Sequence, residues 1–199
     1  QDETTEDISI MAGVSPNEDS YFGTSVLQHA KNRTLWLMLL MLSATVSGEI
    51  LAHYEDAMAA MPILITFIPM LMGTSGNSGS QSSTMVIRGL AVGEIRFKDF
   101  FKVLFKELRI ALLVGTLLAV VNGIRVYLMY DQDLMLAVSI GVTMIGIVCM
   151  AKCVGCVLPL LAKKIGLDPA LMAAPLISTI MDTCTILLYF AIITSIYRM

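Results

Sequence analysis

Residues 170–193 read ALMAAPLISTIMDTCTILLYFAII. This stretch is long enough to cross a bilayer as one helix, because about 20 apolar residues span the hydrocarbon core. It carries Asp182 near its middle. A carboxylate at that depth is costly and is tolerated where it faces protein, water or an ion. Asp182 is therefore the first candidate for a functional residue.

The composition of the whole chain is that of a membrane protein. Of 199 residues, 56% are hydrophobic and 15% are charged, whereas a soluble domain carries about 25% charged residues. The apolar residues fall in long runs, which predicts an all-α membrane protein with five transmembrane helices and argues against a soluble enzyme. The predicted spans cover about 34–52, 57–87, 108–130, 134–161 and 169–197.

The basic residues alternate between the two sides of these spans. They precede the first span and fill the second and fourth connections, whereas 53–56 and 131–133 contain neither Lys nor Arg. By the positive-inside rule the N-terminus is cytosolic, the C-terminus is extracellular and the protein is a multi-pass protein of the cell (inner) membrane. The basic residues are Lys31, Arg33, Arg88, Arg96, Lys98, Lys102, Lys106, Arg109, Lys163 and Lys164.

Charged residues near the span ends have simpler interpretations. Residues 97–108 alternate apolar and basic positions at helical spacing, which predicts an amphipathic helix lying on anionic membrane lipid. Glu107 is then expected to pair with Lys106 and Arg109 at the interface. Lys152 is assigned to a span end, where its side chain snorkels to the headgroups.

The second span carries an unusual polar tract, GTSGNSGSQSST at 73–84. These groups need internal partners or water, because lipid cannot satisfy them. Pro69, just before the tract, is expected to leave the Ile65 carbonyl without its usual donor. The tract therefore packs against other helices, with its glycines as close-packing positions, or it lines an aqueous path. Gly76, Asn77 and Gln81 are its predicted path-lining residues.

One face of the last span gathers oxygen donors. Pro175, Ser178 and Asp182 recur at helical spacing, and Pro175 is a further predicted path-lining residue that is expected to free the Leu171 carbonyl. Oxygen ligands suit hard cations such as Mg²⁺ or Ca²⁺ rather than copper or zinc. Asp168 lies fourteen residues before Asp182, roughly 21 Å at helical rise, which places it at the cytosolic mouth.

Five helices are few for a pore, so a homodimer with the path on its two-fold axis is expected. The alternative functions are a proton-coupled divalent-cation secondary transporter, with Asp182 carrying the proton, and a structural scaffold without flux. Asp182 could also be protonated and hydrogen-bonded between helices. The residues themselves do not rank Mg²⁺ above Mn²⁺, Co²⁺ or Ca²⁺.

Two motifs carry a resemblance to a known family. The stretch PMLMGTSGNSGSQSS at 69–83 closely resembles the signature of the MgtE magnesium transporters and channels. GLDPA at 166–170, followed by Pro175 and Asp182, resembles the last helix of that family. The residues from Thr5 to Phe22 resemble its connecting helix, so the similarity covers essentially the whole chain.

The resemblance implies a homodimeric pore in which Asp182 binds hydrated Mg²⁺, with Asn77 and the Ser178 backbone carbonyl contributing. It implies that Asp168 binds Mg²⁺ together with an acidic, plug-like connecting helix that contains Glu6 and Asp7. Residues 1–30 would form this cytosolic helix and linker, and 31–199 the pore domain. It also implies CBS-type regulatory domains before Gln1, absent from the sequence given. Membrane lipid is an expected partner and nucleic acid is not.

Overall fold

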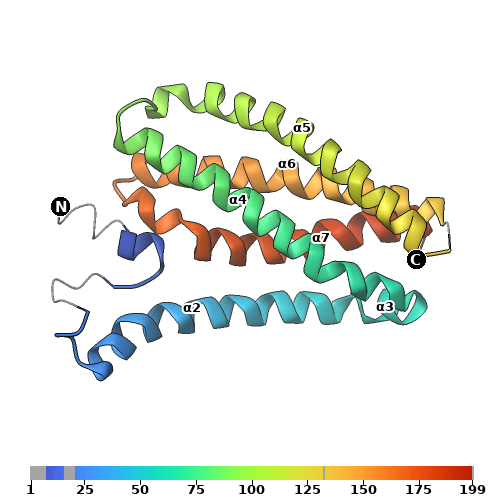
Figure 1. Ribbon diagram of the computed structural model, residues 1–199, viewed down its shortest axis with the longest axis horizontal. Helices are drawn as coiled ribbons and strands as arrows, with labels where there is room; N and C mark the ends of the chain where they lie inside the picture. The colour runs from blue at the N-terminus through green and yellow to red at the C-terminus, as the bar shows by residue number, and fades with distance from the viewer. Residues whose placement is uncertain (1–7, 16–20, 132, 199) are drawn as a thin grey trace.

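The computed structural model describes residues 8–15, 21–131 and 133–198, which form helices and short connections (Figure 1). The helices confirm the predicted all-α class. The long helices are α2 (Val26–His53), α4 (Ile68–Ala91), α5 (Phe100–Met129), α6 (Leu134–Lys164) and α7 (Ala174–Tyr197). The short ones are α3 (Glu55–Ala60) and the 3-10 turns η1 (Pro62–Phe67), η2 (Phe97–Asp99) and η3 (Pro169–Met172).

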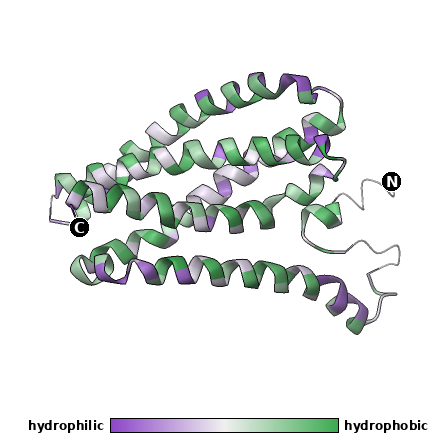
Figure 2. Ribbon diagram, turned by 180° about the vertical axis from the view of Figure 1, so that it is seen from behind, coloured by the Kyte–Doolittle hydropathy of each residue, from purple (hydrophilic) through white to green (hydrophobic). Residues whose placement is uncertain are grey.

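Four of these elements are long and apolar enough to cross a membrane, namely α2, η2 with α5, α6 and α7. The chain is therefore a multi-pass helical membrane protein. Helix α4 has 24 residues, the same length as α7, but it carries the polar tract. Figure 2 shows this tract as a pale to purple stretch that interrupts the hydrophobic colour in the middle of the bundle.

Helix α6 lies at the centre of the bundle, with α5 and α4 packed against it. Helix α7 packs against α4 and α6, and α2 lies along α7 at one edge (Figure 1). Most of α2 is exposed, and Ser47 is its buried residue. The Ser47 and Thr183 hydroxyls, 2.6 Å apart, join α2 to α7. Most of the outer surface of α2 is apolar, as lipid contact requires, and Glu49 lies on it about one turn before the helix ends at His53.

Glycines bring α4 and α6 into backbone contact. A methyl group built on Gly155 of α6 would lie far inside van der Waals contact of the Gly79 carbonyl oxygen of α4. Such small-residue contacts are a common way for membrane helices to approach closely. The prediction that the tract glycines serve close helix packing is confirmed for Gly79.

The predicted second span, 57–87, is wrong at both ends. The chain turns through α3 and η1 before α4 begins at Ile68 and continues to Ala91. Met61 lies outside the α-helical region with φ −141°, because a residue before proline avoids that region. Pro69 lies in the first turn of α4, and the Ile68 N–H bonds to the Ile65 carbonyl. The expected free carbonyl at Ile65 is therefore wrong.

The predicted last span, 169–197, is broken at Ala173. Residues Pro169–Met172 form η3, and α7 begins at Ala174 with Pro175 in its first turn. Proline is tolerated there because the first-turn N–H groups have no partner within the helix. Pro175 therefore frees no Leu171 carbonyl from α7, and the 21 Å helical separation between Asp168 and Asp182 does not apply.

The prediction of a separate amphipathic helix at 97–108 is also wrong. After η2, a single helix runs from Phe100 to Met129 without interruption. No proline lies within it to end the helix, so the basic, partly apolar stretch and the third span form one rod. The inner part of α5 consequently enters the bundle and contacts α6.

The described part of the N-terminal segment folds back on α2. Residues 8–11 are helical, and Gly13 follows with φ +69° directly over the Trp36 indole. The Ser15 N–H bonds to the Asn32 carbonyl at 3.0 Å. Glu6 and Asp7 lie outside the described residues, and the assignment of 1–30 to a cytosolic segment stays a prediction.

Candidate ion site

Asp182 lies on α7, eight residues after its start at Ala174, or roughly 12 Å along the helix axis. Its side chain is half-buried. Among the described residues, none of the hydrogen bonds and ion pairs involves its carboxylate. The neighbouring hydroxyls of Thr183 and Thr185 are committed to Ser47 and Ser75, each at 2.6 Å. The Asp182 carboxylate therefore keeps its full capacity to accept hydrogen bonds from a ligand.

Helix α4 meets α7 one turn before this acid. Gly76 is buried, and a methyl group on it would lie 3.2 Å from the Ser178 Oγ. Ser178 lies four residues before Asp182 and therefore on the same face of α7. The structure thus brings together the polar tract of α4 and the acidic face of α7, which are about a hundred residues apart in the chain.

The other two predicted path residues of α4 lie on its exposed side. Asn77 and Gln81 are one turn apart and exposed, and Gly73 and Met85 continue the same face. No hydrogen bond between described residues joins either amide to Asp182. Their amides make this face unsuitable for lipid.

The opposite side of α4 satisfies its polar groups inside the bundle. The Thr185 hydroxyl of α7 donates to Ser75, and the Ser83 hydroxyl donates to the Met172 carbonyl of η3. Both serines are fully buried. The serines of the tract therefore hold α4 in place, whereas its amides remain available on the exposed face.

Asp168 has a structural role of its own. It caps η3, accepting the Ala170 N–H at 2.8 Å through Oδ1, and it is exposed. Its second oxygen is available to a cation. The helix start at Ala174 separates Asp168 from Asp182, and Pro175 lies half-buried in that first turn. Within the described ranges, no group of three or more His, Cys, Asp or Glu residues is placed to hold a metal ion.

A second polar cluster was not expected from the sequence. Lys152 of α6 lies 4.0 Å from Glu107 of α5, with 6% and 13% of their side chains exposed. Ser82 of α4 donates to Glu107 at 2.5 Å and accepts from Lys152 at 3.3 Å. The predicted pairing of Glu107 with Lys106 and Arg109 is wrong, and Lys152 does not snorkel.

The depth of Lys152 in the membrane can be estimated from the sequence, by counting residues from the basic end of its span. It lies twelve residues before Lys164, roughly 18 Å from the inner end of α6. That is too deep for a headgroup contact by a side chain that is itself buried. Glu107 carried no such signal, because the sequence predicts it on an amphipathic helix that lies along the membrane surface.

A multi-pass helical bundle with an unpaired carboxylate and an exposed amide-bearing helix face has the features of a membrane transport protein. Residues 68–192 match the MgtE family of divalent cation transporters, and the chain belongs to this family. This is a family of transporters and not of enzymes, as the sequence predicted.

Several relatives are similar over nearly the whole chain. The magnesium transporter MgtE of Thermus thermophilus is 34% identical over 96% of the chain. Those of Bacillus subtilis and Enterococcus faecalis are 32% and 30% identical over 89% and 99%. The chain spans about two fifths of these relatives, namely 42%, 39% and 43% of their lengths.

Proposed function

We propose that the chain is the membrane portion of a Mg²⁺-selective channel or transporter, with Asp182 as the central ion site. The observation that carries the proposal is the unpaired, half-buried carboxylate one turn beyond the Gly76–Ser178 contact. Mg²⁺ gives up its water reluctantly and is held by few carboxylates. Asp182 would accept hydrogen bonds from the bound water and supply compensating charge, while Asn77 and the Ser178 carbonyl contribute further oxygens.

Helix α4 is the fifth span in this proposal, and its exposed amides line the ion path. Its 24 residues rise about 36 Å, enough to cross the hydrocarbon core. The Asn77 and Gln81 face cannot remain against lipid, so it requires water or protein. If the two-fold axis of a dimer faces α4, the second copy covers part of this face with protein and encloses a water-filled path along the rest.

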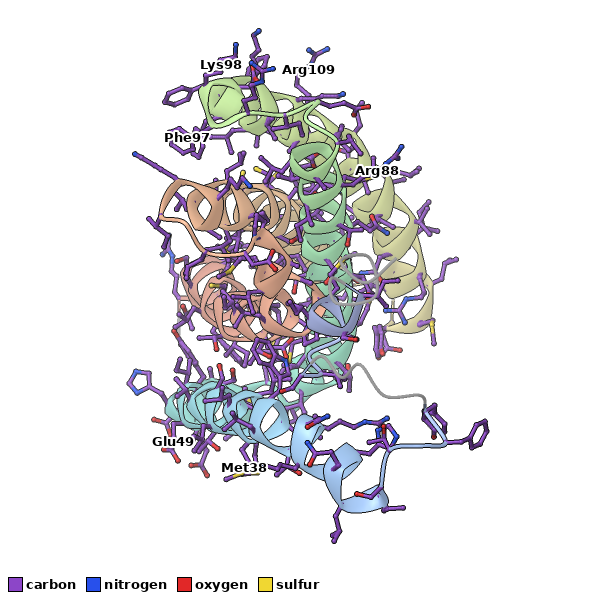
Figure 3. All side chains as sticks on the ribbon, turned by 90° about the vertical axis from the view of Figure 1, so that its left-hand side faces the viewer. Met38, Glu49, Arg88, Phe97, Lys98 and Arg109 are labelled. Atoms are coloured by element: carbon purple, nitrogen blue, oxygen red, sulfur yellow. The ribbon has the colours of Figure 1, made fainter. Side chains whose placement is uncertain are left out.

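The distribution of charge supports a cytosolic N-terminus. The α4–α5 and α6–α7 connections lie at the same end of the bundle as the start of α2 (Figure 1). Arg88 near the end of α4, Lys98 in η2 and Arg109 in the first third of α5 project outward (Figure 3). The acidic connections after α2 and α5 lie at the other end. Asp168 is at the basic, cytosolic end, where it would share cations with Glu6 and Asp7.

The greater length of the relatives supports further segments outside this chain. In the proposal these are cytosolic CBS-type domains that precede Gln1 and regulate the pore through residues 1–30. Mg²⁺ is the proposed cargo, with Mn²⁺ and Ca²⁺ as competing ions of the same ligand preference.

A dimer should show a protein mass of twice 21.6 kDa in nanodiscs, once the mass of scaffold protein and lipid is subtracted.

Cross-linking tests which faces of the two copies meet. In a background without the native cysteines, a short bismaleimide should join two copies of the Asn77→Cys variant, because the α4 faces meet at the axis. Leu113→Cys is the matched control, since Leu113 is 76% exposed on α5, away from α4. A monomer with full transport activity would refute the dimer.

Purified protein in liposomes should pass Mg²⁺ down its concentration gradient without a proton gradient. Flux is measured with an internal Mg²⁺-sensitive dye, at equal internal and external pH and then with a pH step. We expect a change of less than about twofold, because a channel needs the cation gradient alone. Flux that appears only with an inward proton gradient would favour the proton-coupled alternative, and no flux under either condition would favour a scaffold.

A further inference from the structure

The Glu107–Lys152 pair lies deep in the membrane portion of the bundle. Glu107 is seven residues into α5 and Lys152 twelve residues from the inner end of α6, roughly 10 Å and 18 Å along the helices. Both side chains are largely withdrawn from solvent. Charged residues at such depth are expensive and most often serve function. The ion path does not use this pair, so it needs an explanation of its own.

The pair is linked to α4 through one hydroxyl. The Ser82 Oγ donates to Glu107 and accepts from Lys152, so the cluster joins three different helices. Both bonds involve a charged partner, which makes them stronger than bonds between neutral groups. Ser82 is 2% exposed, so water does not compete for these bonds.

Beside the cluster, α4 and α5 are separated by a cavity of about 600 Å³. Ser82, Glu107 and Lys152 line it, together with Gln81 and apolar side chains such as Val103. On this side of α4, the cavity therefore takes the place of close side-chain packing against α5. The polar bonds of Ser82 are what connects α4 to α5 at this level.

On the other sides of α4, the contact with α6 sets distance, whereas the contacts with α7 and η3 share in setting rotation. Gly79 and Gly155 touch through backbone atoms, so the α4–α6 contact itself has no interlocking side chains. Against α7 and η3, α4 is held by the Ser75 and Ser83 hydroxyls and by Ile177, which packs on Gly79. Ser82 and Gln81 are neighbours and point about 100° apart on the helix. Holding Ser82 inward therefore keeps the exposed face with Asn77 turned outward, and Gln81 lies where that face meets the cavity.

We propose that the Ser82–Glu107–Lys152 cluster is a positioning element that holds the rotation of α4 from the α5 side, where Ser75 and Ser83 do not reach, and so keeps the Asn77 face turned to the ion path. The inference rests on the proposed function of that path. Its members touch no ion themselves and act through α4. Loosening the cluster should change how well the path binds and selects the ion, and not only how stable the protein is.

The sharpest test removes the hydroxyl and leaves the charge pair intact. Ser82→Ala should raise the Mg²⁺ concentration for half-maximal flux about fivefold and lower the preference for Mg²⁺ over Ca²⁺, since both hydrogen bonds from the hydroxyl to charged partners are lost. Ser82→Thr keeps the hydroxyl and should stay within about twofold of wild type. Ser78→Ala is the matched control, because Ser78 is a buried serine of the same helix outside the cluster.

A second variant removes both charges together. Glu107→Gln with Lys152→Met avoids leaving one buried charge unpaired and should lower Mg²⁺ flux about tenfold while the thermal midpoint in detergent stays near wild type. Wild-type half-saturation and selectivity in both Ser82→Ala and the double variant would overturn the inference, as would a lower melting temperature with unchanged transport. Failure of the proposed function is distinct, because wild-type protein would then pass no Mg²⁺.

Discussion

Replacing Asp182 with alanine or asparagine is expected to lower Mg²⁺ flux at least about a hundredfold. A divalent ion and a carboxylate about 5 Å apart across one water attract each other by roughly 6–7 kcal/mol at an effective dielectric constant of about 20. Losing even half of that attraction exceeds the roughly 2.7 kcal/mol that a hundredfold change requires. Flux is measured in liposomes with an internal Mg²⁺-sensitive dye, at matched protein content.

The asparagine variant isolates the role of charge, because its side chain has almost the same size as that of aspartate. Glu49→Gln is the matched control, since Glu49 is an exposed acid on α2 and points away from the other helices (Figure 3). Its flux should stay within about twofold of wild type, because a charge screened at the surface contributes little. Unchanged flux and unchanged selectivity in both Asp182 variants would refute the assignment of the central site.

Gly155→Ala is expected to have the largest effect on stability. Its new methyl group would overlap the Gly79 carbonyl oxygen, which is backbone and cannot move away as a flexible side chain could. Forcing α4 and α6 apart should cost roughly 3 kcal/mol, at the upper end of overpacking penalties. The measurement is the thermal midpoint and the monodisperse yield in detergent, and Gly155→Val should give almost no folded protein.

Gly48→Ala is the control for the glycine substitution itself. A methyl group on Gly48 of α2 would meet none of the described atoms within 4 Å. Alanine has the higher helix propensity, so this variant should be as stable as wild type or slightly more stable. A thermal midpoint for Gly155→Ala equal to that of Gly48→Ala would show that the close α4–α6 contact does not limit stability.

Much of the architecture was predictable because membrane-spanning segments have a strong local signal. The helices over 134–161 and the apolar part of 34–52 follow from uninterrupted hydrophobic runs, and the observed α6 and α2 contain both ranges. Two of the errors in helix bounds lie at prolines. Pro62 and Pro175 are compatible with a hydrophobic run, but they confine a helix to starting near them, which hydropathy does not report.

The candidate site was predictable in part. The cost of burying a carboxylate marked Asp182, and the polar tract marked α4, because both conflict with lipid. The division of α4 into a buried serine side and an exposed amide side was not predictable in detail, since both kinds of residue are polar. It depends on which face meets α6 and α7.

The sequence by itself determined the class of protein, the approximate places of the long helices and the two segments that conflict with lipid, because these follow from composition and local spacing. The tertiary structure alone decided that Gly76 meets Ser178, that Gly79 meets Gly155, and that Ser82 joins Glu107 to Lys152. Glu107 and Lys152 are forty-five residues apart, and their pairing arises only when α5 and α6 pack side by side. Local periodicity states which face of a helix is apolar, but it does not state which helix that face will meet.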